Sequence, residues 1–285
     1  VGAGGSPSGS MVDATALTAV RIPHGRLVHA LRDRGSIGWQ LRRLEVCSST
    51  ETELTQWLHQ QPWLASHPRA VLAQHQRFAH GQYGRFWMAP PGGVWLSAAL
   101  PWPHGEPSTG LFGLTVALAL AEQLERYGLS AAIKWPNDLM LGDKKIAGIL
   151  SEVQHNESGD SLLIIGLGLN VGQEDFGSLH DKATSIHQAL PHALTVQQAL
   201  EIAWQAFEKT VDEASDISLA SICENINHHL YAKGKQASIS QGTEKTDGEV
   251  LGIHHDGRIA LQKSDGTIHY LAAGNLFVST DRPKN

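Results

Sequence analysis

The chain has 285 residues, of which 41% are hydrophobic and 18% charged, and its formal net charge at pH 7 is -6. This composition is typical of a soluble globular protein, and the acidic balance argues against a generally basic, nucleic-acid-binding protein. No apolar run is long enough to cross a bilayer. Because Cys47 and Cys223 are the only cysteines, we expect neither a disulfide framework nor a thiolate zinc site, and a cytoplasmic location fits best.

The N-terminal part of the chain is expected to be too short for a DNA-binding domain. Residues 1–10, VGAGGSPSGS, are small and polar and are interpreted as a remnant of expression that lies outside the fold. Residues 14–44 have a mixed pattern with several arginines. A DNA-binding winged helix-turn-helix takes roughly 60 residues or more, so we expect no such domain and no DNA partner.

A helix is predicted after a strand end in the stretch VCSSTETELTQW. Ser49 or Thr50 can cap its N-terminus, and the acidic residues that follow suit the helix dipole. Leu54, Trp57 and Leu58 form an apolar stripe at helical spacing. By itself the Ser-Thr pair is a weak sign of a binding site, because capping explains it equally well.

Two predicted strands enclose a loop that contains glycines. The strands are residues 70–73 and 93–100, and the loop between them carries Tyr83, Arg85 and Trp87. A loop of this kind can fold over a ligand and donate backbone N–H groups to it.

The next predicted element is a helix that we interpret as scaffold. Ser108 can cap it after a proline-rich connection, apolar residues follow at helical spacing, and Gly128 suits its C-terminal end.

The stretch 133–150, IKWPNDLMLGDKKIAGIL, concentrates charge between two runs that are typical of buried strands. Pro136 cannot donate to a ladder, so the first strand is expected to stop just before it. Asn137 and Asp138 should then face a turn, and a second turn is predicted at residues 142–143. This hairpin brings lysines, an amide and a carboxylate to one end of a sheet. The arrangement suits an anionic ligand, although an ordinary hairpin with solvated lysines has the same pattern.

Residues 161–171, SLLIIGLGLNV, are so apolar that a strand buried on both faces is predicted. Gly166 and Gly168 lack the third glycine and the following helix of a dinucleotide-binding turn. Glycine at these positions would instead leave room for a flat ligand against the strand. The polar residues 172–183 are predicted to form a loop.

Thr195 and Gln198 predict a capping box at the start of another helix. The helix should continue to about Val211, with Val196 and Phe207 among the residues that face inward.

The chain changes character from Lys233 onward. Short predicted strands are separated by three Asp-Gly pairs, at residues 247–248, 256–257 and 265–266, which are typical of hairpin turns. Closely spaced strands of this kind indicate a small barrel.

KWPND, followed seven residues after its Asp by the second Lys of KKIAGIL, resembles the signature of the biotin protein ligases. These enzymes attach biotin to carboxylase carrier proteins using ATP. The resemblance implies an α+β fold, with a mixed β-sheet and packed helices forming a class II synthetase-like catalytic domain over residues 11–232. A small SH3-like β-barrel over residues 233–285 would follow.

Other stretches resemble elements of the same family. Ser49 and Thr50 match an S-T-N element that holds the ureido ring of biotin, although Glu51 stands where Asn is commoner. The glycine pair of the 161–171 strand matches G-x-G-x-N, which forms the floor of the biotin pocket and ends near the nucleotide.

The glycine-bearing loop resembles Q-x-x-G-R-G-R-x-G-R-x-W, which covers biotin and the adenylate. Its matching positions are Gln76, Gly81, Gly84, Arg85 and Trp87. Ala79, His80 and Gln82 replace a glycine and two arginines of that pattern. Because neutral His and Gln hold an anion more weakly than an Arg fork does, we expect weaker retention of biotinyl-adenylate.

The resemblance assigns roles to individual residues. Those assigned to catalysis are Lys145, Arg85 and Asp138. Those assigned to biotin are Ser49, Thr50, Gln76, His80, Gly81, Gln82, Lys145, Gly148, Gly166 and Gly168. Those assigned to ATP are Arg85, Trp87, Lys134, Asn137, Lys145 and Asn170. No Mg²⁺ ligand is assigned.

The function implied is a biotin–[biotin carboxyl-carrier protein] ligase that works in two steps. Biotin would attack the α-phosphate of Mg-ATP to give biotinyl-5′-AMP and pyrophosphate, and a carrier lysine would then attack the mixed anhydride. Lys145 and Arg85, with Mg²⁺, would stabilise charge that develops on the phosphate oxygens. Lys134 and Asn137 would position the nucleotide. Asp138 would help orient the metal or the incoming amine.

Two alternatives remain open from the sequence. A lipoate ligase or octanoyltransferase of similar fold could use Cys47 as an acyl acceptor. A non-catalytic biotin sensor would explain the departures in the glycine-bearing loop. In the main interpretation the partner is the carrier subunit of acetyl-CoA carboxylase, there is no membrane partner, and a homodimer can form.

Overall fold

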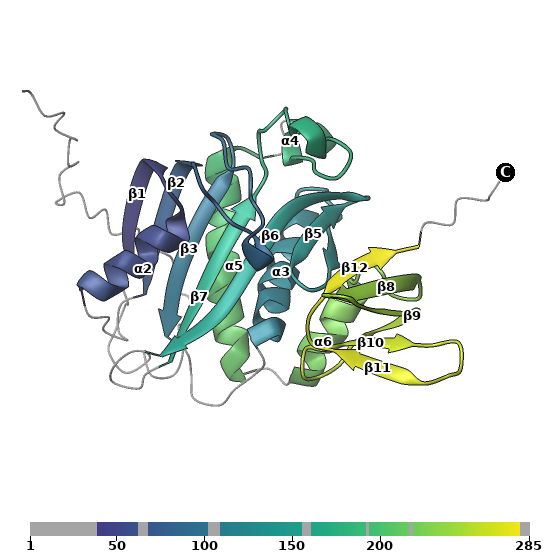
Figure 1. The fold of residues 1–285 in the computed structure, drawn as a ribbon. Coiled ribbons are helices and arrows are strands. Elements are labelled where there is room, and N and C mark those ends of the chain that lie inside the picture. Colours follow the sequence, from purple (N-terminus) through teal and green to yellow (C-terminus); the bar gives the residue numbers. More distant parts are fainter. Residues whose placement is uncertain are drawn as a thin grey trace, which may run out of the picture.

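A computed structural model describes residues 39–61, 68–101, 109–155, 161–191, 194–216 and 219–279. The predicted cap at Ser108, the proposed remnant at residues 1–10 and most of the arginine-bearing stretch lie outside these ranges. The centre of the fold is a seven-stranded sheet with the order β1-β2-β3-β7-β6-β5-β4 (Figure 1). The strands are β1 Gln40–Cys47, β2 Arg69–Gln76, β3 Val94–Pro101, β4 Ala132–Lys134, β5 Asp138–Leu141, β6 Lys144–His155 and β7 Ser161–Leu169. The sheet is mixed, because β1 pairs with β2 in parallel and the other pairs are antiparallel.

Helices cover both faces of this sheet, as Figure 1 shows. The helix predicted after Ser49 is α2, Thr50–Gln60, and it buries Leu54 and Trp57 against one face. The other face packs against α3, Thr109–Glu125, and α5, Val196–Asp216. Short helical segments are η1 Gln82–Gly84, η2 Gly177–Leu179 and α4 Ile186–Ala189.

The predicted capping box of α5 is confirmed. The Gln198 backbone N–H donates to Thr195 Oγ1 over 3.2 Å, and the Thr195 N–H donates to Gln198 Oε1 over 2.9 Å. The inward position predicted for Val196 is wrong, because this side chain is 38% exposed. It lies in the first turn, where the helix has only begun to pack against its neighbours, whereas Phe207 is fully buried as predicted.

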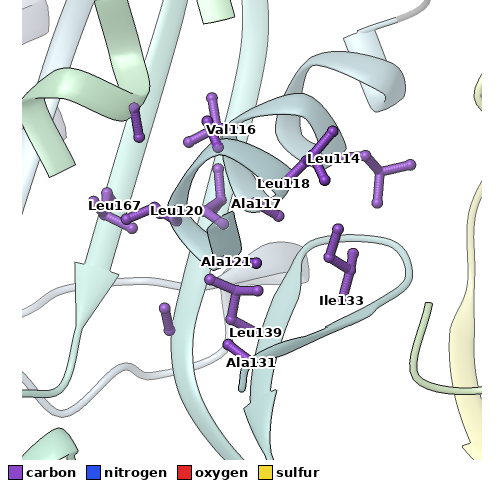
Figure 2. Close-up of a cluster of buried hydrophobic side chains, with 14 of the residues drawn as sticks. Leu114, Val116, Ala117, Leu118, Leu120, Ala121, Ala131, Ile133, Leu139 and Leu167 are labelled. Carbon is purple, nitrogen blue, oxygen red and sulfur yellow. The ribbon is translucent and has the colours of Figure 1, made fainter. Parts of the chain in front are cut away.

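The core joins α3 to the charged hairpin. Figure 2 shows Leu114, Leu118 and other α3 side chains gathered with Ile133 and Leu139. Ile133 and Leu139 are both 0% exposed. Burial of a leucine of this kind is worth roughly 2–5 kcal/mol relative to alanine. One face of the hairpin is therefore fixed by the core.

The hairpin itself has three strands, β4, β5 and β6. The predicted turn at residues 142–143 is confirmed, and Gly142 adopts φ +56° there. The turn predicted at Asn137-Asp138 is shorter than expected, because Asp138 already belongs to β5. Its backbone position is set by pairing with Lys134 on one side and Gly148 on the other.

The outer strand of the hairpin also touches the chain that follows α6, Leu219–His228. The Ile133 N–H donates to the His229 carbonyl over 2.7 Å, and the Tyr231 N–H donates to the Ile133 carbonyl over 2.9 Å. The Tyr231 hydroxyl donates to Asp143 Oδ1 over 2.5 Å. Burial and this hydrogen bond raise the pKa of Tyr231 to about 12. The helix α6 was not predicted from the sequence.

The C-terminal part forms a separate five-stranded antiparallel sheet of order β11-β10-β9-β8-β12. Its strands are β8 Gln236–Gln241, β9 Glu244–Ile253, β10 Ile259–Gln262, β11 Ile268–Leu271 and β12 Asn275–Val278. No ladder joins β11 to β12 among the described residues, so the sheet is open and a closed barrel is not confirmed. Its buried Ile239 and Val250 belong to the same core as α3.

Two of the three predicted Asp-Gly turns are confirmed. Gly257 and Gly266 have φ values of +82° and +84°. The turn predicted at Asp247-Gly248 is wrong, because both residues lie inside β9 and pair with Ser238 and Ala237 of β8. Strand pairing decides the conformation there, and a Cβ on Gly248 would meet the Gln262 carbonyl oxygen at 2.6 Å. None of the described helices is long and apolar enough to cross a membrane.

Candidate functional site

A compact charge cluster lies on the hairpin. Lys145 Nζ is 2.5 Å from Asp138 Oδ1 and 4.8 Å from the centroid of the Trp87 ring. Lys134 is the register partner of Asp138. Burial lowers the pKa of Lys134, an effect that the Asp138 carboxylate opposes and the Lys145 ammonium reinforces. Two lysines therefore share one carboxylate, which leaves net positive charge for an anion.

The backbone around Lys145 is fixed by the polar loop that follows β7. The Lys145 N–H donates to the Lys182 carbonyl over 2.8 Å, and the Thr184 N–H donates to the Lys145 carbonyl over 3.0 Å. Asn170 is buried and donates through its side-chain amide to the Thr184 carbonyl over 3.0 Å. In this arrangement Asn170 holds the loop next to the lysine.

Two cross-strand glycines make a flat surface beside the charge cluster. Gly148 of β6 and Gly168 of β7 are register partners. A Cβ on Gly168 would lie 2.8 Å from the Trp87 ring, and a Cβ on Gly148 would lie 3.1 Å from that ring and from Lys145 Nζ. A side chain at Gly168 would therefore force the indole to shift, and one at Gly148 would be tightly packed. The flat group that covers them is the indole of Trp87, whereas Gly166 faces a cavity.

The glycine-bearing loop forms a tight hairpin that delivers Trp87 to this surface. The Gly81 N–H donates to the Arg85 carbonyl over 2.6 Å, and the Trp87 N–H donates to the Ala79 carbonyl over 2.9 Å. Between them, Tyr83 adopts φ +62°, which is uncommon for a residue with a side chain. Such strained residues often occur at functional sites.

Arg85, predicted as a catalytic residue, contacts the second sheet. Its guanidinium donates to Asn275 Oδ1 of β12 and lies 5.6 Å above the Tyr83 ring. Neither contact involves the Lys145–Asp138 pair. His80 is exposed on the same loop.

A buried polar cluster lies at the start of α2. Gln76 Oε1 accepts from the Thr50 backbone N–H over 2.6 Å and from Thr50 Oγ1 over 3.1 Å. Thr50 Oγ1 is also 2.8 Å from Ser97 Oγ. Ser49 is 5% exposed, and its side chain makes no capping hydrogen bond. The helix therefore begins where predicted, without the predicted side-chain cap.

A cavity of about 370 Å³ opens beside this cluster. Its lining includes four residues predicted from the sequence, namely Gly81, Gln82, Asn137 and Gly166. It also includes polar or aromatic residues that were not assigned to the site, namely Glu51, Tyr83, Ser151 and Glu152, and Ala272 in the connection between β11 and β12. A Cβ on Gly166 would lie 3.8 Å from Ser97 Oγ, so the buried polar cluster borders the cavity floor.

The predicted residues thus fall into three neighbouring groups. The charge cluster and glycine surface contain Lys134, Asp138, Lys145, Trp87, Gly148 and Gly168. The polar cluster contains Thr50 and Gln76, with Ser49 adjacent, and the cavity contains the four residues named above. Arg85, His80 and Asn170 are held apart from these contacts.

Ser97 is the clearest residue that sequence reasoning missed. It is the only polar residue in the predicted strand GVWLSAAL, and it is 1% exposed. A buried hydroxyl among apolar neighbours needs a partner, which is a usable signal. Asn275 could not be found this way, since its contact with Arg85 spans 190 positions of the chain.

The described residues offer no preformed metal site. No group of three or more His, Cys, Asp or Glu side chains among them is arranged to hold an ion. Asp138, the carboxylate predicted to help orient a metal, is paired with Lys145.

Comparison with known proteins gives a consistent picture. Residues 44–170 match the model of the Biotin/lipoate A/B protein ligase family. The bifunctional ligase/repressor BirA of Bacillus subtilis strain 168 is 31% identical over 180 residues, which cover 61% of this chain and 55% of that protein. The biotin–[acetyl-CoA-carboxylase] ligase of Paracoccus denitrificans is 29% identical over 139 residues, covering 47% of this chain and 58% of that protein. The chain therefore spans about half the length of these curated relatives.

Solved structures share the fold. A biotin protein ligase from Aquifex aeolicus, in complex with biotin and ATP, has a TM-score of 0.72 at 23% identity, covering 84% of this chain and 98% of that one. A biotin acetyl coenzyme A carboxylase synthetase from Helicobacter pylori has a TM-score of 0.59 at 22% identity, covering 81% and 98%. The segment that matches the family model, residues 44–170, holds the charged hairpin and both glycine elements.

Proposed function

We propose that this chain is an ATP-dependent biotin–[biotin carboxyl-carrier protein] ligase that acts through biotinyl-5′-AMP. The observation that carries the proposal is the placement of Lys145 beside the flat glycine pair Gly148 and Gly168. A cation at one end and buried hydroxyl and amide groups at the other suit an acid with a polar ring. The relatives from P. denitrificans and B. subtilis, named as ligases, support the same function.

The first step needs charge stabilisation rather than an enzyme nucleophile. When the biotin carboxylate attacks the α-phosphate, negative charge develops on phosphate oxygens, and a positioned ammonium lowers the energy of that state. Lys145 is the group best placed to do so, because its backbone and its ion pair with Asp138 hold it in one position. Lys134 and Asn137 would then position the nucleotide.

For Arg85 to contact the phosphate, as we propose, its guanidinium must first release its hydrogen bond to Asn275. Its guanidinium lies on an exposed loop, so exchanging one hydrogen bond for a phosphate contact involves little packing. A bidentate contact to phosphate would be stronger than the single contact with an amide oxygen.

Magnesium would accompany ATP rather than occupy a protein cage. Mg²⁺ commonly keeps several waters and binds through substrate phosphates with one or two carboxylates. The described residues fit that mode better than a site made of protein ligands alone, since Asp138 is the one carboxylate in the charge cluster.

Further parts of the proposal concern organisation and partners. We propose a catalytic domain over residues 11–232 and an SH3-like domain over 233–285, whose connection between β11 and β12 contributes Ala272 to the cavity. The acceptor would be the carrier subunit of acetyl-CoA carboxylase in the cytoplasm. Homodimer formation is also proposed and is testable by light scattering.

The acyltransferase alternative loses support at Cys47. Burial and, to a lesser degree, the Glu53 carboxylate raise the pKa of this thiol to about 11. Because the thiolate is the nucleophile, such a thiol is a poor acyl acceptor at neutral pH. A ligase that uses ATP needs no such group.

The deciding experiment is biotin-dependent ATP–pyrophosphate exchange, with lipoate and octanoate as parallel acids. Exchange with biotin alone is expected. Exchange with lipoate or octanoate instead would support the other branch of the family. Absence of exchange with every acid, from folded protein supplied with Mg²⁺, would favour a biotin sensor.

A further inference from the structure

The cavity floor at Gly166 is bordered by two carboxylates. Glu51, the second residue of α2, and Glu152 of β6 both line the cavity together with Gly166. Burial raises the pKa of Glu51, the Glu152 carboxylate raises it further, and His80 lowers it in part. No salt bridge involves Glu51 among the described residues, so the cationic group that would best satisfy it is not supplied by this part of the chain.

The neighbouring polar cluster has hydrogen-bonding capacity left over. Ser49 is 5% exposed, and its side chain makes no capping hydrogen bond at the start of α2. Gln76 is 7% exposed, and its two side-chain hydrogen bonds both use Oε1. Buried polar groups are normally satisfied, so unused groups beside a cavity indicate a ligand with polar atoms at this end.

The two ends of the site therefore differ in charge. Lys145 supplies a cation at the glycine pair Gly148–Gly168, whereas two acidic residues, Glu51 and Glu152, line the cavity at Gly166. A ligand that satisfies both ends carries a carboxylate at one end and N–H donors at the other. An ionised carboxylate accepts hydrogen bonds and has none to donate. Its strongest hydrogen bonds come from cationic donors.

We propose that Glu51, with Glu152 beside it, accepts hydrogen bonds from ring N–H groups of the substrate and makes this site favour rings that are rich in N–H donors. The inference rests on the proposed function and deepens it, because it names the residue that selects the ring. An Asn at position 51, the residue commoner in the family pattern, has no charge and cannot favour a cationic ring.

A cyclic guanidine analogue of biotin, 2-iminobiotin, provides the sharpest probe. Its ring has the shape of the ureido ring but carries a positive charge at neutral pH. The measurement is the ratio of dissociation constants for 2-iminobiotin and biotin, obtained by calorimetry at pH 7.5 without ATP. Because binding is measured directly, the result does not depend on adenylation.

The variants are Glu51→Gln and Glu152→Gln, with Glu53→Gln as the matched control. Glu53 lies in the same helical turn, but its charge acts on Arg42 and Cys47 and it does not line the cavity. Losing one charge-assisted hydrogen bond should shift the ratio against 2-iminobiotin by about tenfold in Glu51→Gln. A smaller shift in the same direction is expected in Glu152→Gln, and none in Glu53→Gln.

The outcomes separate this inference from the proposed function. A ratio that stays within twofold of wild type in Glu51→Gln and Glu152→Gln, both folded by circular dichroism, overturns the inference even if exchange with biotin is normal. Failure of folded wild type to bind either ring also overturns it. If Glu51→Gln does not fold, the Glu152→Gln ratio decides. Pyrophosphate exchange, run in parallel, reports on the proposed function alone.

Discussion

The charged hairpin and the glycine-bearing loop meet at Lys145 and Trp87 but are built in opposite ways. The hairpin has one face in the core, with Ile133 and Leu139 0% exposed. The loop leaves large side chains in solvent, including Phe78 at 62%, Tyr83 at 60% and Phe86 at 68%. Core packing therefore fixes the position of the charged side chains on the hairpin. The glycine-bearing loop is held over the site by backbone hydrogen bonds and by the indole of Trp87. We expect mutations in the hairpin to affect catalysis and folding, and mutations in the loop to affect ligand retention.

The largest effect is expected from Lys145→Ala. Loss of the positioned cation should lower pyrophosphate exchange by roughly a thousandfold, equivalent to about 4 kcal/mol. Lys144→Ala is the matched control, because Lys144 is exposed and donates to the His180 carbonyl over 2.7 Å. If folded Lys145→Ala protein exchanged pyrophosphate at the wild-type rate, the proposed role of Lys145 in adenylation would be refuted.

Leu139→Ala tests the buried face of the hairpin. Removing this side chain should lower the free energy of unfolding by about 3 kcal/mol, measured by urea denaturation. In the loop, Phe86→Ala should change the same quantity by less than about 0.5 kcal/mol. Equal losses in the two variants would show that the loop is as firmly packed as the hairpin.

Gly166→Ala and Gly168→Ala separate the cavity from the indole surface. A Cβ at Gly166 makes only 3.8 Å contacts, so stability should be unchanged while biotin binding weakens by about tenfold. A Cβ at Gly168 collides with Trp87 at 2.8 Å and should destabilise the fold by about 1 kcal/mol. Calorimetry measures biotin binding by both variants, and urea denaturation measures their free energies of unfolding. Normal binding of biotin by Gly166→Ala would contradict the expected difference.

The smallest effect is expected from Gln82→Arg, which restores an arginine of the family pattern to the loop. Because position 82 lines the cavity, a guanidinium there should slow release of biotinyl-adenylate by about threefold. Release is followed in rapid dilution without acceptor, and Gln60→Arg, on the far end of α2, serves as the control. Identical release from Gln82→Arg and wild type would mean that the departures in the loop do not govern retention.

Local sequence signals predicted much of the fold and part of the site. The capping box at Thr195 and the turn at Gly142 are decided by neighbouring residues, and both were predicted correctly. The Asp-Gly pair at 247–248 has the same composition as a turn, but pairing with β8 places it inside a strand. Sequence alone cannot weigh a local preference against a ladder formed with a distant segment.

In the site, too, local contacts were predictable from the sequence and contacts between distant segments were not. Lys145 and Asp138 lie seven positions apart on adjoining strands, so their meeting follows from the hairpin. The contact between Arg85 and Asn275, and the cavity position of Glu152, depend on how separate elements pack. The open arrangement of the second sheet likewise depends on which strand edges meet, and patterns of short strands do not specify that.

The backbone bonds between Ile133 and the chain at residues 229–231 have a consequence for solubility. β4 ends the seven-stranded sheet, and an apolar strand with open N–H and C=O groups is a template for intermolecular pairing. The parallel bridge from Ile133 to Leu230 occupies these groups at the middle of the strand. A chain cut before Leu230 would expose this edge, and we expect it to aggregate even though every residue of the charge cluster is still present.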